Sequence, residues 1–222
     1  MNALNKFKEL LIKLSSDPYE TLDSLFHDSG ERLTENRLHD LINLYPDVRY
    51  VLFAPAQELS QIAKLTYKQS KILRMPHLAA LRDAKQKLKG VSIDLDSTEL
   101  REHSTLLIGY HPIELFVLYL LDSRNTYMTH FIHAVGWKAN VRVITEKLLA
   151  ESVVASARGV IFGHNHPSGN MEPSINDMKA HEELRNELMV HGLDLIGSLL
   201  VSKDSYETYQ NIYVKEYVSV FS

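Results

Sequence analysis

The sequence predicts a mixed α/β (α+β) protein with a helical N-terminal domain, residues 1–100, and a second domain, residues 101–222, in which helices flank a central mixed sheet. In the first third, apolar residues recur with the spacing of a helix face, and no stretch alternates with the period of a strand. Beyond it, short runs rich in β-branched and aromatic residues interleave with helical patterns, which is typical of helices layered on a sheet.

The helices expected in the first domain follow this apolar periodicity. Further helical patterns cover residues 34–45, 58–63 and 68–88. From Gly90 to about Tyr110 the chain changes to short polar stretches, and the domain boundary is placed there. The first helix, residues 3–14, carries its apolar side chains at Leu4, Phe7, Leu10, Leu11 and Leu14.

The second domain is expected to alternate strands with helices. Asp122–Asn125 is rich in turn-forming residues and predicts a hairpin between the first two strands. The predicted order is a strand at 113–121, a strand at 127–135, a helix at 143–157, a strand at 159–163, a helix at 175–191 and a strand at 194–202.

Composition excludes several classes of protein. The chain has no cysteine, so disulfides, cysteine-ligated zinc, iron–sulfur clusters and thiol nucleophiles are ruled out. The longest apolar run, Leu115–Leu121, is far shorter than the roughly 20 residues of a membrane helix. The N-terminus begins an amphipathic pattern and does not resemble a signal peptide. We therefore expect a soluble, cytoplasmic protein without a membrane partner.

The charge distribution leaves two interpretations of the first domain open. The net charge of −4 argues against a general polyanion binder. Residues 61–90 nevertheless carry eight Lys or Arg and a single acid, Asp83. Such a block could contact nucleic acid, or it could be the solvated face of one or two helices.

The residues that indicate chemistry follow the strand at 159–163. His164 and His166 are two residues apart at the exit of a strand, where alternate side chains project to the same side. Residues 167–169 turn the chain, and Ser174 then begins a helix that places Asp177 in its first turn. Two imidazoles and one carboxylate, with a fourth position for water, are the ligand set of a catalytic zinc site.

Simpler interpretations exist for each half of this pattern. Either histidine could merely hydrogen-bond a backbone carbonyl. Ser174 and Asp177 also have the spacing of ordinary helix N-capping, in which the hydroxyl accepts a first-turn amide and the acid suits the helix dipole. Capping does not explain the fixed distance between this pair and the histidines, and the joint pattern therefore favours a metal site.

The complete pattern is His164-x-His166, seven residues, Ser174, two residues and Asp177. It resembles the motif of the JAB/JAMM (MPN-type) metalloproteases, and Asn165 with the following Pro-Ser-Gly is similar to the bacterial RadC-like branch. The resemblance covers about residues 105–222. It implies a zinc-dependent hydrolase acting on a peptide or isopeptide bond, with His164, His166 and Asp177 as zinc ligands. It also implies that Glu114 is the general acid/base and that Ser174 helps to hold the reacting oxygen.

Glu114 can be considered on physical grounds as well. It opens an apolar run that predicts a buried strand, where a carboxylate is costly unless it is solvated, paired or near a cation. Glu114 is therefore either a solvent-exposed residue at a strand end or a proton acceptor beside zinc. Glu146 is the reserve candidate, although we expect it on an exposed helix face.

The sequence departs from the RadC-like pattern in two places. Residues 59–73 resemble a helix-hairpin-helix element in their apolar frame, but Lys64 and Thr66 replace its glycines, which compromises close approach of phosphate. A weak electrostatic contact with nucleic acid remains possible through Lys64, Lys68, Lys71 and Arg74. Gly197-Ser198 stands where the branch has an Asp-His pair, and this could alter a contact next to the site.

Three functions follow as alternatives. The first is the zinc-dependent metallopeptidase or isopeptidase. The second is a nucleic-acid-binding, DNA-repair-associated factor whose metal site is structural or vestigial. The third is a module that binds the end of a protein chain without cleaving it.

Overall fold

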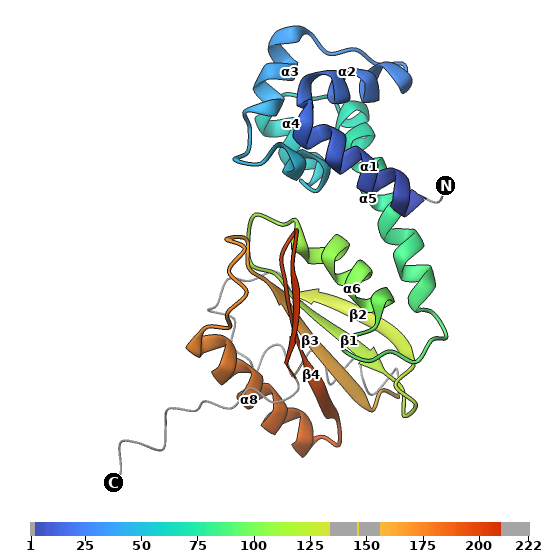
Figure 1. The fold of residues 1–222 in the computed structure, drawn as a ribbon, viewed down its shortest axis with the longest axis vertical. Helices are drawn as coiled ribbons and strands as arrows, with labels where there is room; N and C mark the ends of the chain where they lie inside the picture. The colour runs from blue at the N-terminus through green and yellow to red at the C-terminus, as the bar shows by residue number, and fades with distance from the viewer. Residues whose placement is uncertain (1–2, 134–145, 147–155, 210–222) are drawn as a thin grey trace. The chain divides into compact units, whose positions relative to one another are not determined.

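The structure is a computed structural model that describes residues 3–133, 146 and 156–209. It divides the chain into two compact units (Figure 1). One unit comprises Met1–Gln86 together with Tyr110–Pro112, and the other comprises Lys87–Gly109 together with Ile113–Ser222.

This division differs from the expected boundary at residue 100. Ser92 forms a β-bridge with Thr126, and the Ile93 N–H donates to the Asn125 carbonyl at 2.9 Å. The Tyr127 N–H donates in turn to the Val91 carbonyl at 3.2 Å. Because these backbone hydrogen bonds tie the segment to the sheet, residues 87–109 fold with the second unit.

The first unit is helical, as predicted. Its elements are α1 (Ala3–Ser16), α2 (Pro18–Asp28), α3 (Glu35–Ile42), the 3₁₀ turn η1 (Val48–Leu52), α4 (Ala56–Ile62) and α5 (Tyr67–Leu88). Helix α2 is not among the predicted helices, because an Asp-Pro dipeptide such as Asp17-Pro18 is also typical of a break between elements. Asp17 instead caps the helix by accepting the Glu20 N–H at 3.1 Å, and proline suits the first helical position.

The aromatic core of this unit includes residues far apart in sequence. Phe7 and Phe53 pack edge to face with ring centroids 5.7 Å apart, and Tyr110 stacks on Phe53 at 4.5 Å. Phe7, Phe26 and Phe53 are all almost completely buried. The stacking explains why residues 110–112 belong to the helical unit although residues of the second unit flank them on both sides.

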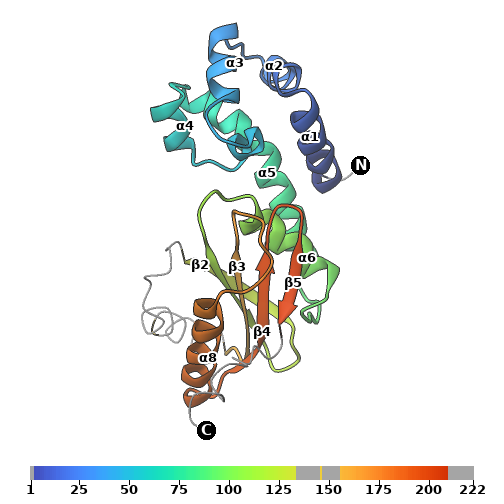
Figure 2. The same cartoon turned by 60° about the vertical axis from the view of Figure 1, so that its left-hand side comes forward.

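The second unit is built on the mixed sheet that the sequence predicted (Figures 1 and 2). Strand β1 lies antiparallel to both β2 and β3, β3 and β4 run parallel, and β4 pairs antiparallel with β5. The strands, in the spatial order β2-β1-β3-β4-β5, are β2 (Tyr127–His133), β1 (Phe116–Leu121), β3 (Gly159–Asn165), β4 (Asp194–Val201) and β5 (Tyr206–Tyr209).

Helices cover both faces of the sheet. Helix α8 (Ile175–Val190), which connects the parallel strands β3 and β4, packs on one face (Figure 2). On the other face, His103 of α6 (Thr98–Ser104) contacts the Tyr119 hydroxyl of β1 at 2.9 Å. A π-helical turn, η2 (Thr105–Gly109), follows α6. The core under α8 contains Phe116, Leu118, Leu120, Val160, Phe162, Leu184, Leu188 and Leu193.

The strands β1 and β3 approach each other closely beside the residues of interest. A Cβ atom added at Gly163 would lie 2.9 Å from Cγ1 of Val117, so glycine is required for this packing. His164, the next residue, lies on the face of the sheet that bears Phe116 and Phe162. The centroid of its ring is 5.7 Å from that of Phe116 and 5.9 Å from that of Phe162. The apolar pairing of β1 with β3 thus fixes where His164 emerges.

Three elements of this unit, α6, η2 and β5, were not predicted, and one prediction falls largely outside the described residues. Helix α6 and strand β5 are short, with seven and four residues. Of the helix expected over 143–157, the structure describes Glu146, which is helical and exposed as expected, and the irregular end after residue 155. Among the described helices, none has the length and apolar character needed to span a bilayer.

Candidate metal centre

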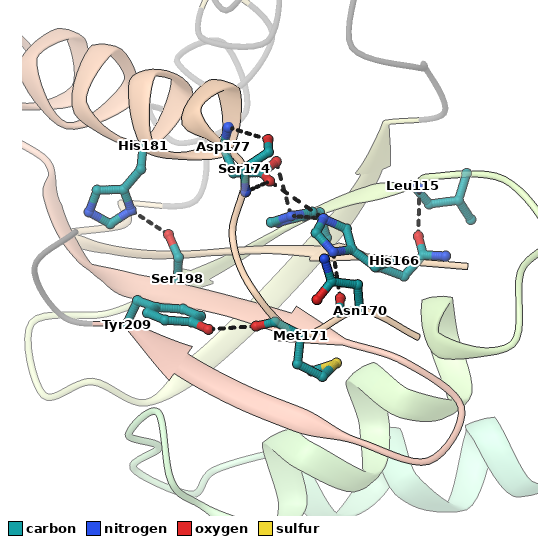
Figure 3. A network of polar contacts seen from close by, with 11 residues as sticks. Leu115, His166, Asn170, Met171, Ser174, Asp177, His181, Ser198 and Tyr209 are labelled. Atoms are coloured by element: carbon teal, nitrogen blue, oxygen red, sulfur yellow. Dashed lines mark hydrogen bonds and ion pairs between the residues drawn. The ribbon is translucent and has the colours of Figure 1, made fainter. Parts of the chain in front are cut away.

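The two histidines of the motif lie at the end of β3. His164 is the second-last residue of the strand, and His166 follows its end. Both residues are buried, with 3% and 9% of their surface exposed, and Figure 3 shows His166 beside the start of α8. The two imidazoles thus lie together at the exit of the strand, with their Nε2 atoms 3.2 Å apart.

The carboxylate is delivered by the first turn of α8. Ser174 is the N-cap, and its hydroxyl oxygen accepts the Asp177 N–H at 3.1 Å. The Asp177 Oδ2 atom accepts the Ser174 N–H at 2.6 Å, which completes a reciprocal capping box. The capping interpretation of this pair is therefore correct, and the same bonds orient the carboxylate toward the histidines.

The three side chains converge on one point (Figure 3). Nε2 of His164 lies 3.2 Å from Nε2 of His166 and 3.1 Å from Oδ1 of Asp177. Oδ2 of Asp177 lies 3.4 Å from Nε2 of His166. Zinc bonds of about 2.0–2.2 Å in a tetrahedron separate neighbouring donor atoms by about 3.3 Å. The two imidazole nitrogens and the carboxylate thus have the identity of zinc ligands, and their closest atoms lie about as far apart as two ligands of one zinc ion.

The protonation of His166 also suits a metal ligand. Its Nδ1 atom lies 2.7 Å from the Asn170 backbone carbonyl, which can only accept, so Nδ1 carries the proton. In the neutral ring this leaves a lone pair on Nε2, the atom that faces Asp177. Metal-binding histidines are commonly oriented by such a hydrogen bond on their other nitrogen.

The loop that supplies this carbonyl is held by the far edge of the sheet. The Tyr209 hydroxyl on β5 donates to the Met171 carbonyl at 2.8 Å (Figure 3). Sequence reasoning did not identify Asn170 or Tyr209, because a backbone acceptor leaves no residue signature and Tyr209 is 38 residues from Met171.

The electrostatics of the site favour an ionised carboxylate. Burial acts to raise the pKa of Asp177, but the adjacent His164 and the hydrogen bonds from Ser174 outweigh burial and lower that pKa below its usual value. Asp177 is therefore a carboxylate at neutral pH. A buried anion between two imidazoles provides the charge that a divalent cation needs.

Glu114 is not part of this three-residue group. It lies two residues before Phe116, the strand residue that pairs with His164. It is partly buried and precedes β1 by two residues. Phe116, the first residue of β1, is the register partner of His164 across the β1–β3 ladder. The strand that was expected to begin at Ile113 therefore begins at Phe116. Glu114 lies in the segment that precedes the strand and not within it. Its role as acid/base stays a prediction.

The Gly197-Ser198 pair has a structural explanation of its own. A Cβ atom at Gly197 would lie 2.5 Å from Leu95 Cδ1 and 2.8 Å from the Tyr209 carbonyl oxygen, so this packing leaves no room for an aspartate. The buried Ser198 hydroxyl hydrogen-bonds Nδ1 of His181, one turn along α8 from Asp177 (Figure 3). The contact between Ser198 and His181 thus joins β4 to α8, the helix that carries the Asp177 carboxylate.

The segment 59–73 forms a helical hairpin from α4 to α5. Lys64 in its turn has a φ of +53°, a conformation that glycine adopts without strain. The Thr66 hydroxyl accepts the Gln69 N–H at 3.2 Å, and Oε1 of Gln69 accepts the Thr66 N–H at 3.0 Å. Two backbone donors at the start of α5 are therefore used within the hairpin.

Two of the basic residues in this segment contact groups of their own unit. Nζ of Lys68 pairs with Glu31 at 2.6 Å, and Nζ of Lys71 lies 4.3 Å from the centre of the Tyr67 ring. Both are exposed contacts of low energy. Nucleic-acid binding by Lys64, Lys68, Lys71 and Arg74 stays a prediction.

Comparison with known proteins places the second unit in a described family. The model of the RadC-like JAB domain matches residues 96–212. A UPF0758 protein of Paraburkholderia phytofirmans is 28% identical over 138 residues, which cover 62% of this chain and 53% of that protein. One from Fusobacterium nucleatum is 27% identical over 174 residues, 75% of each chain. The chain thus spans about half of the first relative and three quarters of the second.

Proposed function

The chain belongs to the RadC-like JAB domain family, and from this premise we propose that it is a zinc-dependent hydrolase that cleaves a peptide or isopeptide bond. The observation that carries the proposal is the convergence of His164, His166 and Asp177, whose donor atoms are 3.1–3.4 Å apart. The fixed tautomer of His166 and the capping box around Asp177 support it further.

The residues divide into those that hold the ion and those that act on the substrate. A zinc ion held by His164, His166 and Asp177 would supply a Lewis acid that polarises a carbonyl and lowers the pKa of water to about 7. The Ser174–Asp177 capping box keeps the carboxylate ligand in place, and Asn170 keeps His166 in the correct tautomer.

Glu114 and Ser174 would handle the proton and the carbonyl oxygen. In this proposal the Glu114 carboxylate takes a proton from the attacking water and returns it to the leaving amine. The Ser174 oxygen accepts the Asp177 N–H and still has an O–H to donate. That O–H would stabilise the negative charge that develops on the substrate oxygen.

Zinc content provides the first test. The full chain, purified without chelators, is expected to contain about one zinc per chain in a tetrahedral site. His164→Ala and Asp177→Asn should abolish the metal, whereas the exposed-residue controls His27→Ala and Asp28→Asn should retain it. A folded wild-type protein that takes up no zinc, even after zinc is added, would overturn the proposal.

Turnover provides the second test and separates an enzyme from a binding module. Zinc-loaded protein is incubated with fluorescence-quenched peptide and isopeptide libraries, beside Glu114→Gln. We expect cleavage by the wild type, whereas Glu114→Gln should retain binding and show only residual cleavage. Binding without turnover in both proteins would favour the module that recognises a chain end, and it would contradict the hydrolase.

A further inference from the structure

Asn165 lies between the two histidines and is completely buried. Its side-chain oxygen, Oδ1, accepts the Leu115 N–H at 2.6 Å (Figure 3). Its side-chain nitrogen, Nδ2, donates to the Ile113 carbonyl at 3.0 Å, and its own backbone N–H donates to the Leu115 carbonyl at 3.3 Å. One residue therefore makes three hydrogen bonds to the segment that leads into β1.

These hydrogen bonds lie on both sides of Glu114. The β1–β3 ladder ends at the pair Phe116 and His164, so regular strand pairing does not reach Glu114. Beyond that pair, the Asn165 amide imitates a peptide group by offering one acceptor to Leu115 and one donor to Ile113. The backbone of Glu114 is thereby fixed to the residue that separates the two imidazoles.

The chemistry of this contact requires an amide. An aspartate would lose the donor to Ile113 and bring an uncompensated buried charge, and a leucine would lose both partners. The geometry is also local to the site, because Asn165 is covalently joined to both His164 and His166. A displacement of its amide would move Glu114 relative to the histidines and leave the histidines at the end of β3.

We propose that Asn165 is a positioning residue that sets the distance between the Glu114 carboxylate and the metal held by His164, His166 and Asp177. This inference rests on the proposed function, because it assigns Glu114 a place beside the metal. Asn165 itself touches no reacting atom.

The first measurement does not depend on turnover. The side-chain δ-carbon of Glu114 is followed by ¹³C NMR on addition of zinc, with Glu114→Gln identifying its resonance. We expect zinc to shift this resonance in the wild type and in Asn176→Leu, an exposed asparagine control on α8. In Asn165→Leu, most of that shift should be lost while zinc affinity, measured by chelator competition, stays within about threefold.

The second measurement is a double-mutant cycle on cleavage of the best library peptide. Asn165→Leu is expected to lower kcat by about 10- to 100-fold with KM little changed. In the Glu114→Gln background the same substitution should cause no further loss. A merely structural role would instead reduce zinc affinity and would add its loss to that of Glu114→Gln.

The outcomes separate this inference from the proposed function. A zinc-dependent shift that Asn165→Leu abolishes, without turnover in any variant, would support the positioning role and contradict the hydrolase. A wild-type shift that Asn165→Leu retains, or no shift in the zinc-loaded wild type, would overturn the positioning role. If Asn165→Leu does not fold, Asn165→Asp, which keeps an acceptor for Leu115, should lose part of the shift, and a full shift would overturn the role.

Discussion

The hydroxyl of Tyr209 donates a hydrogen bond of 2.8 Å to the carbonyl of Met171, and this contact links the edge strand β5 to the loop that orients His166. We expect Tyr209→Phe to weaken zinc binding by about three- to tenfold, because outer contacts of this kind tune metal affinity. Chelator competition measures the change. The matched control is Tyr206→Phe on the same strand, whose hydroxyl donates to Leu95. Equal losses in both variants would contradict a specific role of Tyr209.

The capping box couples helix stability to the metal site. Ser174→Ala removes the acceptor of the Asp177 N–H, so we expect the free energy of unfolding to fall by about 1 kcal/mol. Zinc affinity should fall as well, because one of the two bonds that orient Asp177 is lost. Urea denaturation and chelator competition report the two effects. Ser97→Ala is the control, since Ser97 is the N-cap of α6 and makes no side-chain capping hydrogen bond.

The buried His181 predicts acid sensitivity. Burial, together with the nearby Arg185, lowers the pKa of His181 to about 4. Below its unfolded pKa of about 6.5 the unfolded chain takes up a proton that the folded chain refuses, so stability is lost as the pH falls from about 6.5 toward 4. We expect about 1–2 kcal/mol of this loss by pH 5.

The measurement is urea denaturation between pH 7 and 5, with a chelator present so that zinc release does not contribute. His181→Gln should show a smaller decrease in unfolding free energy than the wild type. His27→Gln, at an exposed position, should follow the wild type. An identical slope in His181→Gln and the wild type would show that His181 is not the group responsible.

Close packing at Gly163 predicts a specific steric effect. Gly163→Ala would bring a Cβ atom to 2.9 Å from Cγ1 of Val117 and should cost about 1–3 kcal/mol of unfolding free energy. Val117→Ala removes that methyl group, so the double variant should be more stable than the sum of the single effects predicts. Strict additivity in urea denaturation would be inconsistent with a direct clash.

The basic face of α5 gives a prediction about nucleic acid. Any DNA binding should be weak and should decrease steeply with salt, because Lys68 and Lys71 offer phosphate contacts without a glycine hairpin. Lys68→Glu/Lys71→Glu should abolish it, while His164→Ala should retain it. The control Lys85→Glu/Lys89→Glu reverses two other exposed charges. Fluorescence anisotropy at several salt concentrations measures the DNA affinity of each variant. Binding that survives in Lys68→Glu/Lys71→Glu but is lost in Lys85→Glu/Lys89→Glu would refute the assignment of DNA binding to Lys68 and Lys71.

Much of the candidate site has a local sequence signal because its residues lie close together in the sequence. His164, His166, Ser174 and Asp177 follow one another across a strand end, a turn and a helix start, and each of these has a local signature. The same local rules predicted the helices α1, α3, α4, α5 and α8 and the positions of the strands β1 to β4. They also predicted the hairpin pairing of β1 with β2.

The contacts that support the site could not be predicted in this way. Asn165 binds a carbonyl 52 residues earlier, and His181 meets a serine 17 residues later, so no spacing rule connects the partners. The short elements α6 and β5 contain too few residues to establish a period. Helix α2 has no clear sequence signal at its start, because an Asp-Pro dipeptide can separate two elements as well as begin a helix.

The short segment Tyr110–Pro112 has a practical consequence for dissecting the protein. Neither compact unit is a single uninterrupted piece of polypeptide, since these residues interrupt the second unit and complete the first. A gene fragment that starts at residue 101 omits Val91 and Ile93, which hydrogen-bond to the first hairpin, and leaves Tyr110 without the ring it stacks on. One cloning boundary therefore cannot yield both halves intact, and biochemical work should use the entire polypeptide.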